Sequence, residues 1–191
     1  MKVTVFLGSP RVEGNTEILV KEALRAVKEA GHTVTLFRPS EMTISPCTNC
    51  GGCDLTGECV IEDDMSEVYS AIYEGERFIL ASPIFFFGLT AQVKALIDRA
   101  QALWCEKYLL NRPIKAGPAG RKALLIMVGG MKKEIGFTGG GATAKAFFRT
   151  ISVPDHETIY FDGVDKKGAI REHSTALNAV HEAAVRLVAT D

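Results

Sequence analysis

The chain has 191 residues, 47% of them hydrophobic and 24% charged, which is enough for one domain to bury a full core without disulfide bonds. Its net charge of −1 gives no basic surface, which argues against binding to nucleic acid or to an anionic membrane. No apolar run approaches the roughly 18 residues that a membrane span needs. Because residues 1–7 read as a strand and not as a signal peptide, we expect a cytoplasmic protein.

Strand-like and helical segments alternate along the chain. Short apolar runs predict strands over residues 3–7, 32–37, 77–81, 122–128 and 156–161. Apolar residues at helical spacing predict helices over about 15–30, 64–73, 90–104, 141–150 and 169–189. Asp64 and Glu67 predict a capping box at the second helix, and Arg99 falls on the polar face of the third.

This alternation predicts an α/β fold, with a single domain over residues 1–191 and a doubly wound, five-stranded parallel sheet of order 2-1-3-4-5. Such sheets have right-handed crossovers and bind ligands at the carboxyl ends of the strands, between the first and third. The loops after the first four strands are unusual in sequence, and we expect them to converge at this edge. They are residues 8–16, about 43–62, 82–88 and 129–130.

The loop after the second strand carries four cysteines in thirteen residues: Cys47, Cys50, Cys53 and Cys59. This C-x2-C-x2-C-x5-C run suits four thiolates converging on one small object, and the glycines within it let the backbone wrap closely, so it favours a [4Fe-4S] cluster. Zinc sites usually have two cysteine pairs a dozen or more residues apart, and disulfides are rare in a reducing cytosol, but both remain open. Cys105 is predicted to be a buried, inert thiol.

The first loop, GSPRVEGNT, ends at the N-terminus of a predicted helix. Free N–H groups and the positive end of the helix dipole favour a phosphate at such a place. An ordinary capped turn between strand and helix is the alternative. The donors, the positive charge and the small residue that suit a phosphate are Ser9, Arg11, Gly14, Asn15 and Thr16.

The third loop, SPIFFFG, is apolar where the chain is expected to approach solvent. Its three phenylalanines could belong to the core or to a dimer interface, but beside a phosphate loop they favour the flat ring of FMN.

A second glycine motif is less informative. Gly139, Gly141 and Ala144 match G-x-G-x-x-A, but they follow the fourth strand by about ten residues, so we interpret them as a helix entry.

Together these motifs resemble a known family. GSPR-x-x-GNT, SPI-x-x-x-G followed by x-x-AQ-x-KALIDR, and a double glycine after the fourth strand are similar to the flavodoxin-like NAD(P)H-dependent FMN reductases. With the cysteine run added, the chain resembles the iron-sulfur flavoprotein branch. The resemblance spans essentially the whole chain and implies a flavodoxin-like fold, bound FMN, and a homodimer or homotetramer with the flavins near subunit interfaces.

The resemblance also implies roles for individual residues. The loop after the first strand would hold the FMN phosphate through Ser9, Arg11, Asn15 and Thr16. The isoalloxazine ring would lie against Ser82, Pro83, Ile84, Phe85, Phe86 and Gly88, with its other edge closed by Gly129 and Gly130. Cys47, Cys50, Cys53 and Cys59 would ligate a [4Fe-4S] cluster. Similar proteins often carry a tyrosine in the SPIFFFG loop, so a hydroxyl contact to the ring is not expected here.

Three functions are compatible with these features. The first is an FMN-dependent electron-transfer oxidoreductase in which a two-electron flavin is coupled to a one-electron cluster at the same sheet edge. The second is an NAD(P)H-dependent FMN or quinone reductase without a cluster, and the third a non-catalytic flavodoxin-like carrier with structural zinc. We expect small molecules or proteins as electron donors and acceptors, with NAD(P)H as a candidate donor. No residue stands out as an acid or base, so no catalytic side chain is assigned.

Overall fold

The computed structural model describes residues 1–117, 119–132 and 134–189. The strands are β1 (Lys2–Leu7), β2 (Thr33–Phe37), β3 (Arg77–Pro83), β4 (Lys122–Val128) and β5 (His156–Phe161). The α-helices are α1 (Asn15–Glu29), α2 (Met65–Glu74), α3 (Ala91–Arg99), α4 (Gln101–Trp104), α5 (Ile135–Thr150) and α6 (Ala176–Val188). All strand pairs are parallel, and their order β2-β1-β3-β4-β5 confirms the predicted doubly wound topology.

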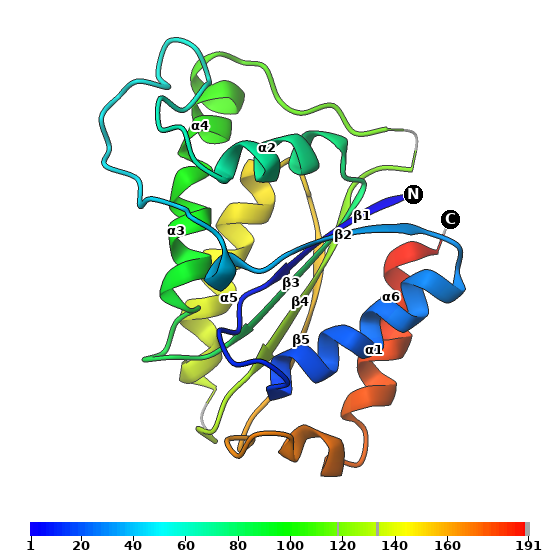
Figure 1. Cartoon of the computed structure of the whole chain (residues 1–191). Helices are drawn as coiled ribbons and strands as arrows, with labels where there is room; N and C mark the ends of the chain where they lie inside the picture. Colours follow the sequence, from blue (N-terminus) through cyan, green and yellow to red (C-terminus); the bar gives the residue numbers. More distant parts are fainter. Residues whose placement is uncertain (118, 133, 190–191) are drawn as a thin grey trace.

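Helices cover both faces of the sheet, with α1 and α6 on one side and α2, α3 and α5 on the other (Figure 1). The central strands β1, β3 and β4 are almost entirely buried because each face lies against a helical layer, whereas the edge strands β2 and β5 are partly exposed. Along β3, Ile79 and Ala81 pack toward α1 and α6, whereas Phe78 and Leu80 pack toward the opposite layer. This alternation follows from the two-residue period of a strand.

The helix predicted over residues 90–104 is divided in the structure. α3 ends at Arg99, α4 follows after Ala100, and the chain then continues in a π-helical turn, η2 (Cys105–Leu109). The predicted position of Arg99 on the polar face is wrong, because this side chain is buried beneath the cysteine loop. Gln101 and Ala102, directly after the division, line the cavity formed by that loop.

Two helix starts also differ from prediction. α5 begins at Ile135 and not at residue 141, because the glycines of its first turns let the helix pack closely against β4 and the loop after β3. The last helix begins at Ala176, after a 3-10 turn, η3 (Ala169–Glu172). The predicted capping box is wrong: the Asp64 carboxylate accepts a hydrogen bond from Thr43 N (2.7 Å) and does not cap α2.

The loop that carries the cysteines leaves the carboxyl end of β2 through a 3-10 turn, η1 (Pro39–Glu41). It then runs back beside α3 and reaches α4 before the chain enters α2 (Figure 1). The cysteines therefore lie at the far end of α3 and not at the carboxyl edge of the sheet, where the sequence predicted them. Across the described residues, no helix is both long and apolar enough to cross a membrane.

Candidate functional site

Two adjoining cavities lie at the carboxyl edge of the sheet. The first is polar and is lined by all five predicted residues of the loop after β1. The second is an apolar cavity of about 330 Å³, a size typical of small-ligand sites. The two cavities share a wall, so a polar compartment adjoins an apolar one. This arrangement matches FMN, which has a charged phosphate at one end and a flat ring at the other. The shared residues are Ile84, Phe85, Gly129 and Gly130.

The polar cavity is built on the N-terminus of α1. Gly14 is the N-cap, and no side chain caps the first turn within the described residues, so its N–H groups face the cavity region uncapped. Ser9 Oγ accepts a hydrogen bond from Arg11 N (3.2 Å), which shapes the loop and leaves Arg11 exposed at the rim. A helix N-terminus with an adjacent cation is well suited to a phosphate.

Asn15 lines this cavity, but its amide group is already engaged. Nδ2 donates to Lys166 O (3.0 Å) and Oδ1 accepts from Ile170 N (3.3 Å). The side chain thus ties α1 to the loop after β5. Asn15 thus has a structural role, and it lines the cavity predicted to hold the phosphate together with Ser9, Arg11 and Thr16.

Glu17, in the first turn of α1, is a buried carboxylate that sequence reasoning missed. It accepts hydrogen bonds from Arg38 Nη2 (2.8 Å) and Glu13 N (2.6 Å) and lies 3.3 Å from Lys21 Nζ. The Arg38 hydrogen bond is the main cause that lowers the Glu17 pKa to about 2, against the opposing effect of burial. Its charge is thus balanced locally, which limits repulsion of an anion at the neighbouring cavity.

The loop after β3 is a tight hairpin with aromatic residues at its tip. Phe85 and Gly88 exchange two backbone hydrogen bonds of 3.0 Å, and between them Phe86 and Phe87 both have positive φ, 48° and 64°. Two successive positive φ angles define a turn that strongly prefers Asn-Gly, so bulky aromatics there are strained. Such strain concentrates at functional sites.

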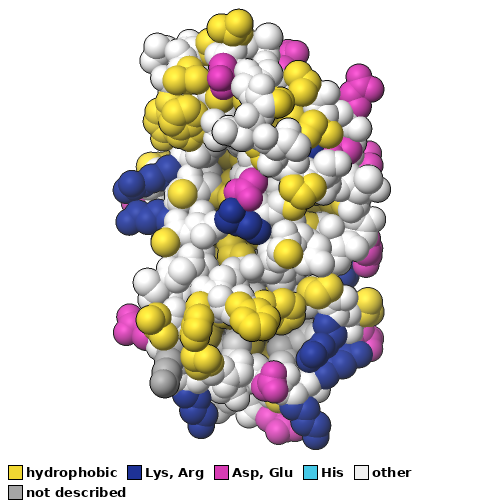
Figure 2. Space-filling view, turned by 90° about the vertical axis from the view of Figure 1, so that its left-hand side faces the viewer, with side chains coloured by type: hydrophobic (Ala, Val, Ile, Leu, Met, Phe, Trp, Pro, Cys, Tyr) yellow, Lys and Arg dark blue, Asp and Glu magenta, His cyan; other side chains and the backbone are white. Residues whose placement is uncertain are grey.

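The hairpin contributes to an apolar surface. On the face shown in Figure 2, hydrophobic side chains gather in a band across the lower half of the molecule. The Phe86 side chain is fully exposed, at 103%, and Phe85 and Phe87 are half-exposed. Phe86 and Phe87, together with Met131 and Phe137, also line the apolar cavity, so the hairpin has both a cavity-facing and an outward-facing role.

Two predicted ring contacts are absent from the walls of both cavities as the described residues define them. Ser82 is fully buried, where its Oγ donates to Pro83 O (2.8 Å) and accepts from Thr90 N (3.3 Å), so it shapes the hairpin base. Gly88 uses its N–H and carbonyl within the hairpin. Conversely, Val164 and Asp165 line the polar cavity unpredicted. The signal for them was topological, because the loop after β5 also begins at the carboxyl edge of the sheet.

The four cysteines Cys47, Cys50, Cys53 and Cys59 line one small cavity, closed by the junction of α3 and α4. Cys50 is exposed and the other three are partly buried. The structure therefore brings the whole predicted set together in the wall of one cavity. It also adds Arg99 and Gln101 to the same wall, which the sequence did not suggest.

Arg99 fastens both stems of the cysteine loop. Its buried guanidinium donates to Ser45 O (3.0 Å) before the cysteines, and to Ile61 O (3.1 Å) and Asp63 Oδ2 (2.6 Å) after them. Burial acts to raise the pKa of Asp63, but hydrogen bonds from Arg99, Ser45 N and Met65 N together outweigh it, so the pKa is lowered. Arg99 Nε is buried without a hydrogen-bond partner in the described chain, so one N–H of the cavity wall lacks an acceptor.

Cys105, predicted to be inert, lies beside the cysteine loop. Its Sγ is 3.6 Å from Cys53 Sγ, donates to Asp54 Oδ1 (3.3 Å) and accepts from Gln101 Nε2 (3.4 Å). Burial, followed by the neighbouring Cys105, raises the pKa of the Cys53 thiol to about 12. Spacing along the chain gave no signal for this contact, because 52 positions separate the two cysteines.

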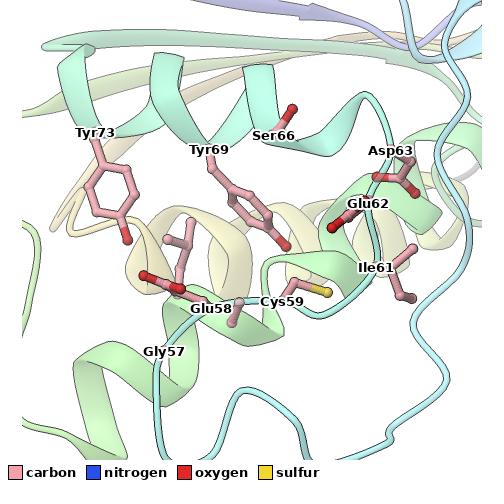
Figure 3. A pocket seen from close by; sticks show the side chains of 11 residues that line it. Gly57, Glu58, Cys59, Ile61, Glu62, Asp63, Ser66, Tyr69 and Tyr73 are labelled. Atoms are coloured by element: carbon pink, nitrogen blue, oxygen red, sulfur yellow. The ribbon is translucent and has the colours of Figure 1, made fainter.

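A separate cavity of about 420 Å³ lies on the other side of Cys59, between α2 and α4. Figure 3 shows the rings of Tyr69 and Tyr73 projecting from α2 toward the segment that carries Cys59. Tyr69 Oη donates to Arg99 O (2.6 Å) and Tyr73 Oη to Glu106 Oε2 (2.5 Å). Cys59 therefore forms part of the wall between the cysteine cavity and this open cleft.

The length of α3 separates the cysteine cavity from the cavities at the sheet edge. At its start, Thr90 Oγ1 donates to Gly8 O (2.8 Å) beside the loop after β1, and at its end Arg99 enters the cysteine cavity. Nine helical residues rise about 13 Å. The expectation that the two sites lie side by side within one chain is therefore wrong.

The arrangement of a polar and an apolar cavity at this edge agrees with the comparison to protein families. Residues 1–139 match the family described as NADPH-dependent FMN reductase. The chain belongs to this family. The predicted family resemblance is thereby confirmed, and the matched segment includes every predicted site residue.

Among curated proteins, the chain is similar to iron-sulfur flavoproteins. It is 42% identical over 112 residues to one from Methanocaldococcus jannaschii, covering 59% of this chain and 58% of that protein. It is 38% identical over 117 residues to one from Methanosarcina thermophila, covering 61% of each. The chain thus spans about three fifths of the length of these relatives.

Solved structures support the fold of this FMN reductase family member. The chain superimposes on an NAD(P)H:quinone oxidoreductase from Methanothermobacter marburgensis with a TM-score of 0.74, covering 100% of this chain and 98% of that one. The sequence identity is 17%, so the likeness shows a shared fold. The predicted flavodoxin-like architecture is confirmed.

Proposed function

We propose that this family member is an FMN-dependent electron-transfer oxidoreductase in which the flavin is coupled to a [4Fe-4S] cluster. The observation that carries the proposal is the pair of sites built by one chain. One is a polar cavity joined to an apolar cavity, and the other is a small cavity whose wall contains all four cysteines.

The residues at the sheet edge fit FMN. Gly14 lets the loop after β1 fold closely onto the N-terminus of α1, because a Cβ there would lie 3.0 Å from Arg11 O. At the other end, a Cβ on Gly129 would lie 3.4 Å from both Ile84 and Phe137 in the wall of the apolar cavity. Arg11 and the helix N–H groups would bind the phosphate, while Ile84, Phe85 and the double glycine would hold the ring.

The cysteine cavity fits an anionic cluster. Four thiolates around a [4Fe-4S] core carry a net negative charge, and Arg99 contributes the only guanidinium among the residues that line the cavity in the described structure. Its partnerless Nε supplies an N–H donor that a thiolate or a sulfide would satisfy. Arg99 would therefore offset charge as well as hold the loop.

No three thiols of the cysteine run lie as close together as a zinc site requires in the described residues. Tetrahedral zinc with bonds of about 2.3 Å brings its sulfur ligands to about 3.8 Å from one another. In the described residues, the one group of three ligand atoms within 4.8 Å of one another is Cys53, Asp54 and Cys105. Cys47, Cys50 and Cys59 belong to no such group, which suits a larger inorganic core.

Bound FMN would exchange electrons in pairs or singly and a [4Fe-4S] cluster one at a time, so together they would link two-electron donors such as NAD(P)H to one-electron acceptors. The chain would position both groups and set their electrostatic surroundings. We further propose a homodimer or homotetramer, because a fully exposed Phe86 at a strained hairpin tip is suited to burial against another copy.

A second candidate is a NAD(P)H-dependent flavin or quinone reductase that needs no cluster. One observation favours it: α3 separates the cavities at the sheet edge from the cysteine cavity, so flavin binding does not require the cysteines. Steady-state reduction of quinone by NAD(P)H in iron-free protein would support this candidate.

Anaerobic reconstitution tests the proposal. We expect one FMN and four iron and four sulfide ions per chain, with an absorption spectrum that bleaches on reduction. The variants C47S and C59S should lose iron and keep FMN. Zinc in place of iron, or a C47S variant with unchanged iron, would rule out the cluster.

A further inference from the structure

We propose that Cys53 and Cys105 form a redox-active thiol pair, which closes into a disulfide in cluster-free protein and thereby prevents Cys53 from taking up iron. The disulfide itself depends only on the geometry of the two thiols. Its competition with cluster binding rests on the proposed function, in which Cys53 is a cluster ligand.

The two sulfurs are already in contact. Cys53 Sγ and Cys105 Sγ lie 3.6 Å apart, and a disulfide bond of about 2.05 Å needs an approach of about 1.5 Å. Gly51 and Gly52 precede Cys53 in a loop of turns, so its backbone can supply this movement. Among the five cysteines, this is the one pair for which a sulfur–sulfur contact is found in the described residues.

Two polar neighbours fix the direction of the Cys105 thiol. Its S–H donates to Asp54 Oδ1 (3.3 Å), and its sulfur accepts from Gln101 Nε2 (3.4 Å). A cysteine whose only role is to fill the core would not require a hydrogen bond from Gln101 or one to Asp54. The same sulfur lies at the start of the π-helical turn η2, where Leu110 N reaches back to Cys105 O (3.0 Å). Such turns are frequent at functional sites.

The pair is reachable from solvent on one side. Cys105 is buried, but Cys53 is partly exposed and Asp54 is exposed. A small thiol oxidant can therefore approach through Cys53. Both S–H bonds break and one S–S bond forms, while two electrons and two protons pass to the oxidant. With diamide, they reduce its N=N bond to the hydrazine, so the reaction balances.

The consequence is a switch between two states of Cys53. In the reduced state it is free to bind iron with the other three cysteines of the run. In the oxidised state it is bonded to Cys105, and the loop is then covalently attached to η2. A cluster lost under oxidising conditions would then not reform until a thiol reductant opened the bond.

Diamide treatment of iron-free protein tests the pair, with peptide mapping under non-reducing conditions. We expect a Cys53–Cys105 cross-link and a fall from five free thiols to three. The C105S variant, which retains a hydroxyl for Asp54 and Gln101, should show no such cross-link. The matched variant C50S removes an exposed cysteine of the same loop and should cross-link as the unaltered protein does.

Three results would overturn the proposal. One is a dominant disulfide between two cysteines of the run, the second is an unmodified Cys105, and the third is zinc that is retained by the unaltered protein and lost in C105S.

Reconstituted protein distinguishes a failure of this proposal from a failure of the proposed function. There, bound iron should slow the cross-link roughly tenfold or more. Protein that takes up no iron contradicts the cluster, while the cross-link in iron-free protein still stands.

Discussion

Arg99 and Asp63 form a buried ion pair of 2.6 Å at the base of the cysteine loop. Because Arg99 also bonds the opposite stem through Ser45 O, removing its guanidinium should release both ends of the loop. We expect R99Q to lower the free energy of unfolding by about 3–5 kcal/mol. R99K, which keeps the charge but loses the planar fork, should have a smaller effect.

Iron content distinguishes the role of Arg99 at the cysteines from a purely structural one. R99Q should bind less iron after reconstitution than R99K, and the reduction potential of R99Q should be lower because a positive charge is lost. Arg121 provides a matched control, since it is buried, donates to Ile72 O (2.5 Å) and lines no part of the cysteine cavity. R121K should keep its full iron content. Equal potentials in R99Q and R99K would contradict the electrostatic role.

Arg11 is predicted to bind the FMN phosphate. Its side chain is exposed, so R11A should leave stability unchanged. Loss of a charge-assisted hydrogen bond should weaken FMN binding roughly ten- to a hundredfold. Riboflavin, which lacks the phosphate, should bind R11A and the unaltered protein equally in a fluorescence titration. R25A, on the helix that follows this loop and paired with Glu22 and Glu29, serves as the control and should not change FMN affinity.

Two glycines of α5 should respond in opposite ways to alanine. A Cβ on Gly139 would lie 2.5 Å from Phe87 O, so G139A should displace the hairpin, destabilise the fold by about 1–3 kcal/mol and weaken flavin binding. A Cβ on Gly141 would meet only Met127 Cε, at 4.0 Å. G141A should therefore stabilise the helix by up to about 1 kcal/mol. Chemical denaturation of both variants checks this, and equal effects would refute the assigned packing.

The hairpin tip should show a trade between stability and binding. Replacing Phe86 and Phe87, at φ 48° and 64°, with Asn and Gly supplies the residues that this turn prefers. The double variant F86N/F87G should raise the melting temperature of the flavin-free protein, since about 1–3 kcal/mol of strain per residue is relieved. Its FMN affinity and its tendency to self-associate should fall. Unchanged self-association would show that the aromatic tip is not an interface.

Glu17 should make stability depend on pH in the acid range. Its pKa is about 2 in the folded protein against an ordinary value of 4.5, so its contribution is complete above pH 4.5 and is lost as the pH falls toward 2. E17Q should be less stable than the unaltered protein at pH 7, and the difference should shrink below pH 4.5. Urea unfolding of both proteins across this range measures it. A difference independent of pH would assign the effect to packing.

The sequence by itself determined the sheet order and most element boundaries. Periods of two and 3.6 residues are local, and alternation of strand and helix leaves few topologies, so β3 and β4 could be recognised from apolar runs. The cysteine run and the loop after β1 were also readable, because each gathers its chemistry within a short segment. The helix that begins at Ile135 was placed too late, since its glycines favour a loop until tertiary packing stabilises the helix.

The tertiary structure alone decided which side chains meet. Asn15 engages Lys166 and Ile170 across more than 150 residues, and Cys53 meets Cys105 across 52. Arg99, by helical periodicity a solvent-facing residue, is buried because the cysteine loop folds over the end of α3. Local patterns carry no information on such contacts, since the path of a long loop depends on the surfaces that it packs against. The same path separates the two sites that the sequence had placed together.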